Sequence, residues 1–129
     1  MKILTWPDFN ICVQKITVSL QDHNLKGVYG VPRGGLCLAV ALSHSLNLPL
    51  LDSPDKNILI VDDIYETGKT LEPMKMIPGV KIYVWLSKVK PDWWESIEIT
   101  STNEWVVFPW ENLLRAEKDR DLYKQKIQG

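Results

Sequence analysis

Two adjacent carboxylates, those of Asp62 and Asp63, are followed within a few residues by glycine and hydroxyl side chains. Ionised carboxylates only accept hydrogen bonds and are hard oxygen ligands, so the pair suits the hydroxyls of a sugar or a hydrated magnesium ion. Gly68 would let the backbone approach a ligand, and Thr67 and Thr70 would donate hydroxyls to a phosphate at the start of a helix. This segment therefore predicts one ligand that carries hydroxyls, a metal ion and a phosphate together.

Two other motifs share part of this segment, and neither fits. The run from 68 to 70 is similar to the end of a nucleoside-triphosphate loop, but that loop requires a glycine where Asp63 stands. The hydrophobic residues before Asp62 also begin receiver domains, whereas here a full strand–helix–strand stretch precedes them. A lone acidic pair would be an ordinary solvated strand end, and it is the whole string from 61 to 70 that makes the pattern specific.

A second candidate for anion binding is the turn that starts at Pro32. Arg33 offers a guanidinium that binds phosphate oxygens in a bidentate way. Gly34 and Gly35 permit a tight turn whose amides point inward. Arg-Gly-Gly is a weak signal by itself, and it gains specificity from its place ahead of the acidic pair.

The elements that would position these residues alternate between strands and helices. Hydrophobic runs predict strands over 28–31, 48–51, 57–62 and 80–86, and helices over 8–22, 36–46 and from about 70 to 79. This order predicts an α/β fold with an open, mostly parallel sheet flanked by helices. Ligands of such sheets bind beyond the carboxyl ends of the strands, which is where the acidic pair and the Arg33 turn are expected to lie.

Both ends of the chain are predicted to be helical. In the first helix Asp8 is the expected cap, and the apolar positions include Ile11, Ile16, Val18 and Leu20. In the last, highly charged segment the apolar positions are Leu113, Leu114, Leu122 and Ile127. We expect this last helix to pack on the domain, and an interface with a partner chain is the alternative.

The composition is that of an ordinary globular domain. The chain has 129 residues, of which 45% are hydrophobic, enough for one core. A net charge of −1 argues against a nucleic-acid binder with a broad basic surface, and no segment is long and apolar enough for a membrane span. The start of the chain lacks a secretory leader, so we expect a cytoplasmic protein. Cys12 and Cys37 are expected to be buried thiols, and His23 and His44 to be surface or helix-packing residues.

With these features in place, the chain resembles the type I phosphoribosyltransferases. Their signature is a hydrophobic strand, two acidic residues and a Thr-Gly-x-Thr loop that binds phosphoribosyl pyrophosphate, and residues 61–70 match it. The turn over 32–35 is similar to the loop that holds the pyrophosphate leaving group in that family. The resemblance is closest to the bacterial xanthine–guanine members and covers most of the chain, including Thr5-Trp6, Lys88 and the stretch 104–111.

The resemblance implies a magnesium-dependent enzyme of purine salvage that transfers a phosphoribosyl group to guanine, xanthine or hypoxanthine and releases pyrophosphate. The residues implied in donor binding are Arg33, Gly34, Gly35, Asp62, Asp63, Glu66, Thr67, Gly68, Lys69 and Thr70. Asp62 and Asp63 would contact the ribose hydroxyls and hold Mg²⁺, largely through water and the donor. Glu66 stands where relatives usually have Asp, and it would relay a proton to the attacking base.

The resemblance also implies a base site. The core would span about 1–90, a small hood 91–111 and the last helix 112–127 of a single domain, with a homodimer or higher homo-oligomer as the assembly. In the hood Trp105 would stack on the purine and the Val106 backbone would contact its edge, while Lys88 would donate to the oxygen at the purine 6-position. The remaining tryptophans of this region are expected to pack in the core: Trp93, Trp94 and Trp110.

The chain departs from this family between the second and third core strands. Most members carry a long mobile loop there, which closes over the reaction, whereas this chain has only residues 52–56. Three alternatives follow: another element serves as the lid, including one from a partner subunit; turnover is slow; or the domain binds phosphoribosyl pyrophosphate or nucleotides without catalysis. Phosphoribosyl transfer to another acceptor, such as a pyrimidine, also remains open.

Overall fold

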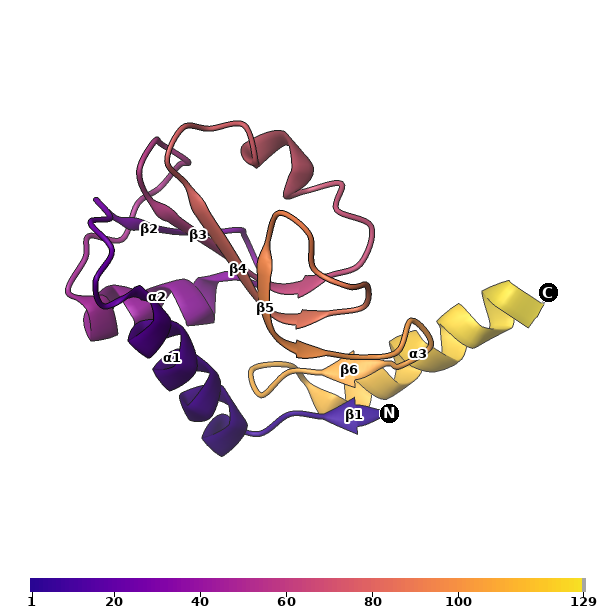
Figure 1. Ribbon diagram of the computed structural model, residues 1–129. Helices are drawn as coiled ribbons and strands as arrows, with labels where there is room; N and C mark the ends of the chain where they lie inside the picture. Colours follow the sequence, from indigo (N-terminus) through magenta and orange to yellow (C-terminus); the bar gives the residue numbers. More distant parts are fainter. Residues whose placement is uncertain (129) are drawn as a thin grey trace.

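The computed structural model describes residues 1–128, and its centre is a four-stranded parallel sheet (Figure 1). The strands lie in the order β2 (Val28–Gly30), β3 (Leu59–Tyr65), β4 (Lys81–Ser87) and β5 (Glu95–Ile99). Every neighbouring pair in this sheet is parallel. The predicted α/β fold with an open parallel sheet flanked by helices is therefore confirmed.

The central strand β3 extends further than its hydrophobic run predicts. It continues through the two carboxylates to Tyr65, because Ile64 and Tyr65 still pair with β4. On its other side the partner strand β2 ends earlier, with Gly30 opposite Val61. The prediction that the strand ends at Asp62 is wrong, and the acidic pair instead occupies a stretch of β3 that is paired on one side only.

Helices α1 (Trp6–Leu20) and α2 (Leu36–Leu46) pack on one face of the sheet (Figure 1). The cap of α1 is Thr5, not Asp8 as predicted. Thr5 and Asp8 form a reciprocal capping box, with N–O distances of 2.9 and 3.2 Å. The buried stripe of α1 is Phe9, Cys12, Ile16 and Leu20. The predicted apolar positions Ile11 and Val18 are exposed, because they lie between the i, i+3 and i, i+4 steps of that stripe.

The second face of the sheet is covered by loops. The predicted helix after Thr70 is reduced to one 3₁₀ turn, η1 (Glu72–Met74), since Pro73 and Pro78 interrupt regular helical hydrogen bonding. Trp94 stacks on the ring of Tyr65 at the end of β3, with ring centroids 3.7 Å apart and planes at 11°. Within residues 1–128 this face therefore carries no α-helix whose N-terminus would meet a phosphate.

Of the two elements predicted between β2 and β3, the helix is present and the strand is not. Helix α2 has the predicted bounds and ends at Asn47 in the left-handed conformation, with φ 54°. The strand predicted over 48–51 is reduced to one bridge, between Leu50 and Val28. Cys12 is buried and Cys37 half-buried, and both are free thiols.

A small second sheet connects the two ends of the chain. It pairs β1 (Lys2–Ile3) in parallel with β6 (Val106–Val107) and leads into α3 (Leu113–Gln128). In Figure 1 α3 extends away from the main sheet on the side of β1 and β6. The predicted apolar positions of α3 that the structure describes are exposed: Leu113, Leu114 and Leu122. Ala116 is buried instead, and the side chain of Ile127 lies outside the described residues.

None of the helices within residues 1–128 is both long enough and apolar enough to cross a membrane.

Candidate active site

The acidic pair lies on β3 beyond the point where β2 ends. The Asp62 carboxylate accepts a hydrogen bond from the amide of Asp63 (2.8 Å), and the Asp63 carboxylate accepts one from the amide of Ile64 (2.8 Å). Burial, together with the neighbouring charge of Asp63, raises the pKa of Asp62 to about 8. Burial also raises the pKa of Asp63. Two half-buried carboxyl groups held this close favour either a shared proton or a ligand that brings positive charge or hydroxyl donors.

A cavity of about 220 Å³ is formed by the end of β3 and the turn that follows it. Gly68 has φ 79°, and a β-carbon there would overlap the phenol of Tyr65, so the turn requires glycine. The amide of Lys69 lies 3.5 Å from the Thr67 hydroxyl. Within residues 1–128, the amides of Thr67, Gly68 and Thr70 donate no hydrogen bond to the protein. These free amides and hydroxyls suit a phosphate, although no α-helix dipole supports them.

The Arg33 turn is closed by its own backbone. The amide of Val31 donates to Val61 on β3 (2.9 Å), and the amide of Gly35 donates to Val31 (2.8 Å). A β-carbon on Gly35 would lie 2.5 Å from the Val61 carbonyl oxygen, so this residue allows the turn to approach β3. Because its amide is already used, Gly35 shapes the turn instead of offering the inward donor that the sequence predicted. Gly34 faces Asp63 directly and lines a cavity with it.

A third set of residues surrounds a cavity of about 200 Å³ next to the acidic pair. Lys88 directly follows β4, and its Nζ lies 3.6 Å from Oε1 of Glu66. Trp105 and Val106 lie opposite, in the segment that β6 anchors. The ring of Trp105 also contacts Tyr123 of α3, with centroids 5.7 Å apart and planes at 37°. The structure thus brings together the three residues predicted to hold a base, although Lys88 and Trp105 are 17 positions apart in the sequence.

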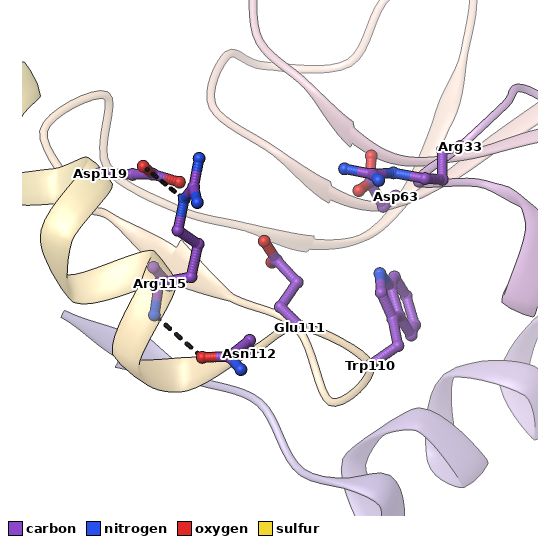
Figure 2. A pocket seen from close by; sticks show the side chains of 9 residues that line it. Arg33, Asp63, Trp110, Glu111, Asn112, Arg115 and Asp119 are labelled. Atoms are coloured by element: carbon purple, nitrogen blue, oxygen red, sulfur yellow. Dashed lines mark hydrogen bonds and ion pairs between the residues drawn. The ribbon is translucent and has the colours of Figure 1, made fainter.

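A cavity of about 610 Å³ lies between the Arg33 turn and α3 (Figure 2). Its lining combines the turn, the acidic strand and the beginning of the last helix: Arg33, Gly34, Asp63, Trp110, Glu111, Asn112, Arg115, Ala116 and Asp119. Asp63 also lines the other two cavities. Three adjoining cavities therefore meet at one carboxylate.

Several of these lining residues are not predicted by the sequence. Trp110 packs in the core as predicted, stacked on Phe108 at 5.1 Å and 8°, but it also faces the 610 Å³ cavity. Glu111 accepts a hydrogen bond from the Phe108 amide (2.9 Å), which holds it at the cavity floor. Arg115 and Asp119 give no signal in a segment where charged residues occur throughout. Only the packing of α3 against the hood brings them to the site.

At this site Asp62 and Asp63 are the carboxylates that could contact a metal ion, and they do not form a complete set of ligands. Within the described residues no group of three or more His, Cys, Asp or Glu side chains could hold a metal ion. The Asp62 and Asp63 carboxylates suit a hard cation such as Mg²⁺, which commonly keeps several waters and shares a phosphorylated ligand with one or two protein carboxylates. The donor set thus fits a magnesium ion that would be held jointly with a substrate.

The overall arrangement is that of the type I phosphoribosyltransferase fold, as the resemblance implies. No family model matches the chain. The structure is similar to that of a purine phosphoribosyltransferase from Pyrococcus horikoshii, with 29% identity, coverage of 86% of this chain and 93% of that chain, and a TM-score of 0.72. Two further structures share the fold. The xanthine-guanine-hypoxanthine phosphoribosyltransferase of Helicobacter pylori has 19% identity, 92% and 98% coverage and a TM-score of 0.70. A hypothetical protein from Neisseria gonorrhoeae with bound ppGpp has 16% identity, 92% and 94% coverage and a TM-score of 0.66.

The Pyrococcus horikoshii structure, that of a purine phosphoribosyltransferase, supports phosphoribosyl transfer, the chemistry of a glycosyltransferase, as the activity class.

Proposed function

We propose that the protein is a cytoplasmic purine phosphoribosyltransferase, which transfers the 5-phosphoribosyl group of phosphoribosyl pyrophosphate to guanine, xanthine or hypoxanthine and releases pyrophosphate. The observation that carries this proposal is the meeting of three cavities at Asp63. A donor with its ribose at this carboxylate would extend its 5-phosphate, its pyrophosphate and the incoming base into one cavity each. The similar purine phosphoribosyltransferases add support for this substrate class.

The donor would be held by three sets of groups. Asp62 and Asp63 would accept hydrogen bonds from the ribose hydroxyls. The stretch 66–70 would donate its free amides and hydroxyls to the 5-phosphate, with Lys69 as a nearby cation. The Arg33 guanidinium and the amide of Gly34 would bind the pyrophosphate.

The base would bind in the cavity of about 200 Å³. The side chain of Lys88 is only 13% exposed and already faces this space, so it would donate to the oxygen at the purine 6-position. The ring of Trp105 would stack on the base, an interaction that contributes about 1–3 kcal/mol per base. The Val106 backbone would contact the edge of the ring. An oxygen at position 6 is what a lysine donor selects, which favours the oxopurines.

In the reaction the bond between the anomeric carbon and the pyrophosphate oxygen would break first, which leaves an oxocarbenium-like sugar. A purine nitrogen would then add from the opposite face, and Glu66 would take up the proton that this nitrogen loses. Bound Mg²⁺, held by Asp62 and Asp63 through water and by the donor, would neutralise charge on the departing pyrophosphate. The other side chains position the two reactants and stabilise developing charge.

The test is pyrophosphate release from phosphoribosyl pyrophosphate and Mg²⁺ with guanine, xanthine, hypoxanthine, adenine or a pyrimidine base. We expect release with at least one oxopurine, and a loss of at least about 100-fold in Asp62→Asn and Asp63→Asn. Asp22→Asn, at an exposed residue after α1, is the matched control and should retain full activity. Pyrophosphate release with a pyrimidine and with no purine would show that the enzyme transfers the phosphoribosyl group to a pyrimidine instead.

A second candidate function is a regulatory protein that binds phosphoribosyl pyrophosphate or purine nucleotides without catalysis. The short segment 52–56 favours it, because a lid loop is not available there. The Neisseria gonorrhoeae protein of this fold, which holds ppGpp, is consistent with such a role. Tight donor binding without pyrophosphate release for any base in the panel would select this candidate over the enzyme.

A further inference from the structure

We propose that Arg115 of α3 is a second cation for the pyrophosphate of the donor, so that α3 takes the place of the lid loop that residues 52–56 are too short to form. This inference rests on the proposed function. It assigns a role to a residue outside the motifs that define the site.

The segment 52–56 lies at the wrong edge of the sheet to cover the site. Just before it, the amide of Leu51 donates to Val28, the first residue of β2 (2.8 Å). Just after it, the Asn57 carbonyl accepts a hydrogen bond from the amide of Lys26 (2.8 Å), and the Asn57 amide donates to the carbonyl of Pro78 (2.9 Å). Lys26 precedes β2 and Pro78 precedes β4. Both anchors are at the amino edge of the sheet. From there to the acidic pair β3 rises for about four residues, or about 13 Å.

Arg115 lies on the wall of the 610 Å³ cavity opposite Arg33. Figure 2 shows the two arginines on either side of this space, with Glu111 between them. The start of α3 is fixed, because Asn112 accepts hydrogen bonds from the amide of Arg115 through its side chain (3.0 Å) and from that of Ala116 through its carbonyl (2.9 Å). Ala116 is 5% exposed and packs this turn of the helix against the protein.

The Arg115 guanidinium is held by a contact that is easily exchanged. Its Nε lies 3.4 Å from Oδ1 of Asp119, one turn further along α3, and the two side chains are 78% and 49% exposed. Ion pairs at this level of exposure stabilise little, so Asp119 gives up its partner at small cost. A phosphate group offers the same guanidinium two parallel charge-assisted hydrogen bonds, which is a stronger arrangement.

The charges around the cavity indicate why a second cation is needed. The acids that face it are Asp63, Glu111 and Asp119, against Arg33 and Arg115 as cations. Pyrophosphate is a polyanion, and with Arg33 as the sole cationic side chain the acidic side chains of this lining would outnumber the basic ones. When Arg115 turns from Asp119 to the ligand, cations contact the pyrophosphate from both walls of the cavity.

The experiment is calorimetric titration of the protein with Mg²⁺-pyrophosphate and, separately, with ribose 5-phosphate. In Arg115→Gln we expect pyrophosphate to bind roughly tenfold more weakly, while ribose 5-phosphate binds as in the wild type. Lys118→Gln is the matched control: it removes an exposed cation of the same helix that does not line this cavity, and both affinities should stay unchanged. In Asp119→Asn, which frees Arg115, pyrophosphate should bind more tightly.

Three results would count against the proposal, and they are distinguishable. If ribose 5-phosphate binds but Arg115→Gln and the wild type hold pyrophosphate equally well, Arg115 has no part in the site and the inference alone is wrong. If the wild type binds neither probe in the presence of Mg²⁺, the proposed function is wrong and the inference falls with it. Weaker pyrophosphate binding in Asp119→Asn would contradict the exchange of partners.

Discussion

Gly34 lies so close to Asp63 that a β-carbon at residue 34 would overlap the Asp63 carboxylate. This contact joins the Arg33 turn to the acidic strand, and it makes the geometry of the site depend on the absence of one side chain. The carboxylate that all three cavities share is therefore positioned from two directions, by its own strand and by the glycine of the neighbouring turn.

Gly34→Ala is expected to displace the Asp63 carboxylate, since one of the two groups must move. Donor binding, measured by calorimetry with phosphoribosyl pyrophosphate and Mg²⁺, should weaken at least about tenfold, with a stability loss of about 1–3 kcal/mol. Gly27→Ala is the control. There the new β-carbon would lie 2.7 Å from the Leu51 side chain, at the opposite edge of the sheet from Asp63. The free energy of unfolding should therefore fall while donor affinity stays unchanged. Equal donor affinity in Gly34→Ala and the wild type would show that residue 34 does not position the Asp63 carboxylate.

Asp62→Asn is expected to stabilise the free protein in a pH-dependent way. The pKa of Asp62 is raised from 3.8 to about 8 in the folded protein, so the fold binds this proton more tightly than the unfolded chain does. The stability that the folded protein gains from binding this proton is fully present below pH 3.8 and is lost as the pH rises towards 8. The variant should therefore gain stability relative to the wild type between pH 5 and pH 8, by about 1–3 kcal/mol.

Urea denaturation of both proteins at several pH values measures this difference. Asp22→Asn, an exposed residue, should follow the wild type throughout. A difference between Asp62→Asn and the wild type that is the same at pH 5 and pH 8 would show that burial does not raise the pKa of this carboxyl group.

Lys88→Met is expected to weaken base binding without weakening phosphate binding by the turn after β3. Its ammonium faces the base cavity and lies 3.6 Å from Glu66, so its loss removes a donor to the purine oxygen. Affinity for guanosine monophosphate should fall about tenfold while that for ribose 5-phosphate stays unchanged. Lys90→Met, at an exposed residue two positions further on, is the control. A parallel loss of both affinities would instead indicate that Lys88 supports the fold.

Trp105→Ala tests the stacking surface. Loss of the ring should cost about 1–3 kcal/mol in nucleotide binding, measured with guanosine monophosphate. Trp6→Ala serves for comparison, because that ring is half-exposed and packs on Phe9 away from the base cavity. Unchanged nucleotide affinity in Trp105→Ala would mean that this ring only packs against Tyr123.

The sequence predicts β2, β3 and β4 of the central sheet because their signals are local, whereas β5 lies in the stretch 91–111 that the resemblance assigns to the hood. Residues 58–61 are apolar at successive positions, a pattern typical of a strand buried on both faces. Helix 36–46 is bounded by glycine and by Asn47, so its ends could be read directly. The acidic pair and the Arg33 turn are also predicted, since each belongs to a continuous motif in the sequence.

The sequence fails where pairing or packing between distant segments decides the structure. Asp62 and Asp63 are poor strand residues, yet β4 keeps them in the sheet by pairing with Ile64 and beyond. The position of Arg115 depends on how β1 and β6 join the two ends of the chain and direct α3 towards the site. Neither relationship leaves a periodic pattern or a motif in the sequence.

A crystal structure with phosphoribosyl pyrophosphate, Mg²⁺ and an oxopurine analogue bound would show directly whether the three cavities at Asp63 hold the two substrates. We expect the ribose at Asp63, the 5-phosphate against residues 66–70, and the analogue between Lys88 and Trp105. A structure with no phosphate at the 66–70 turn, or with the donor bound away from Asp63, would contradict the proposed function.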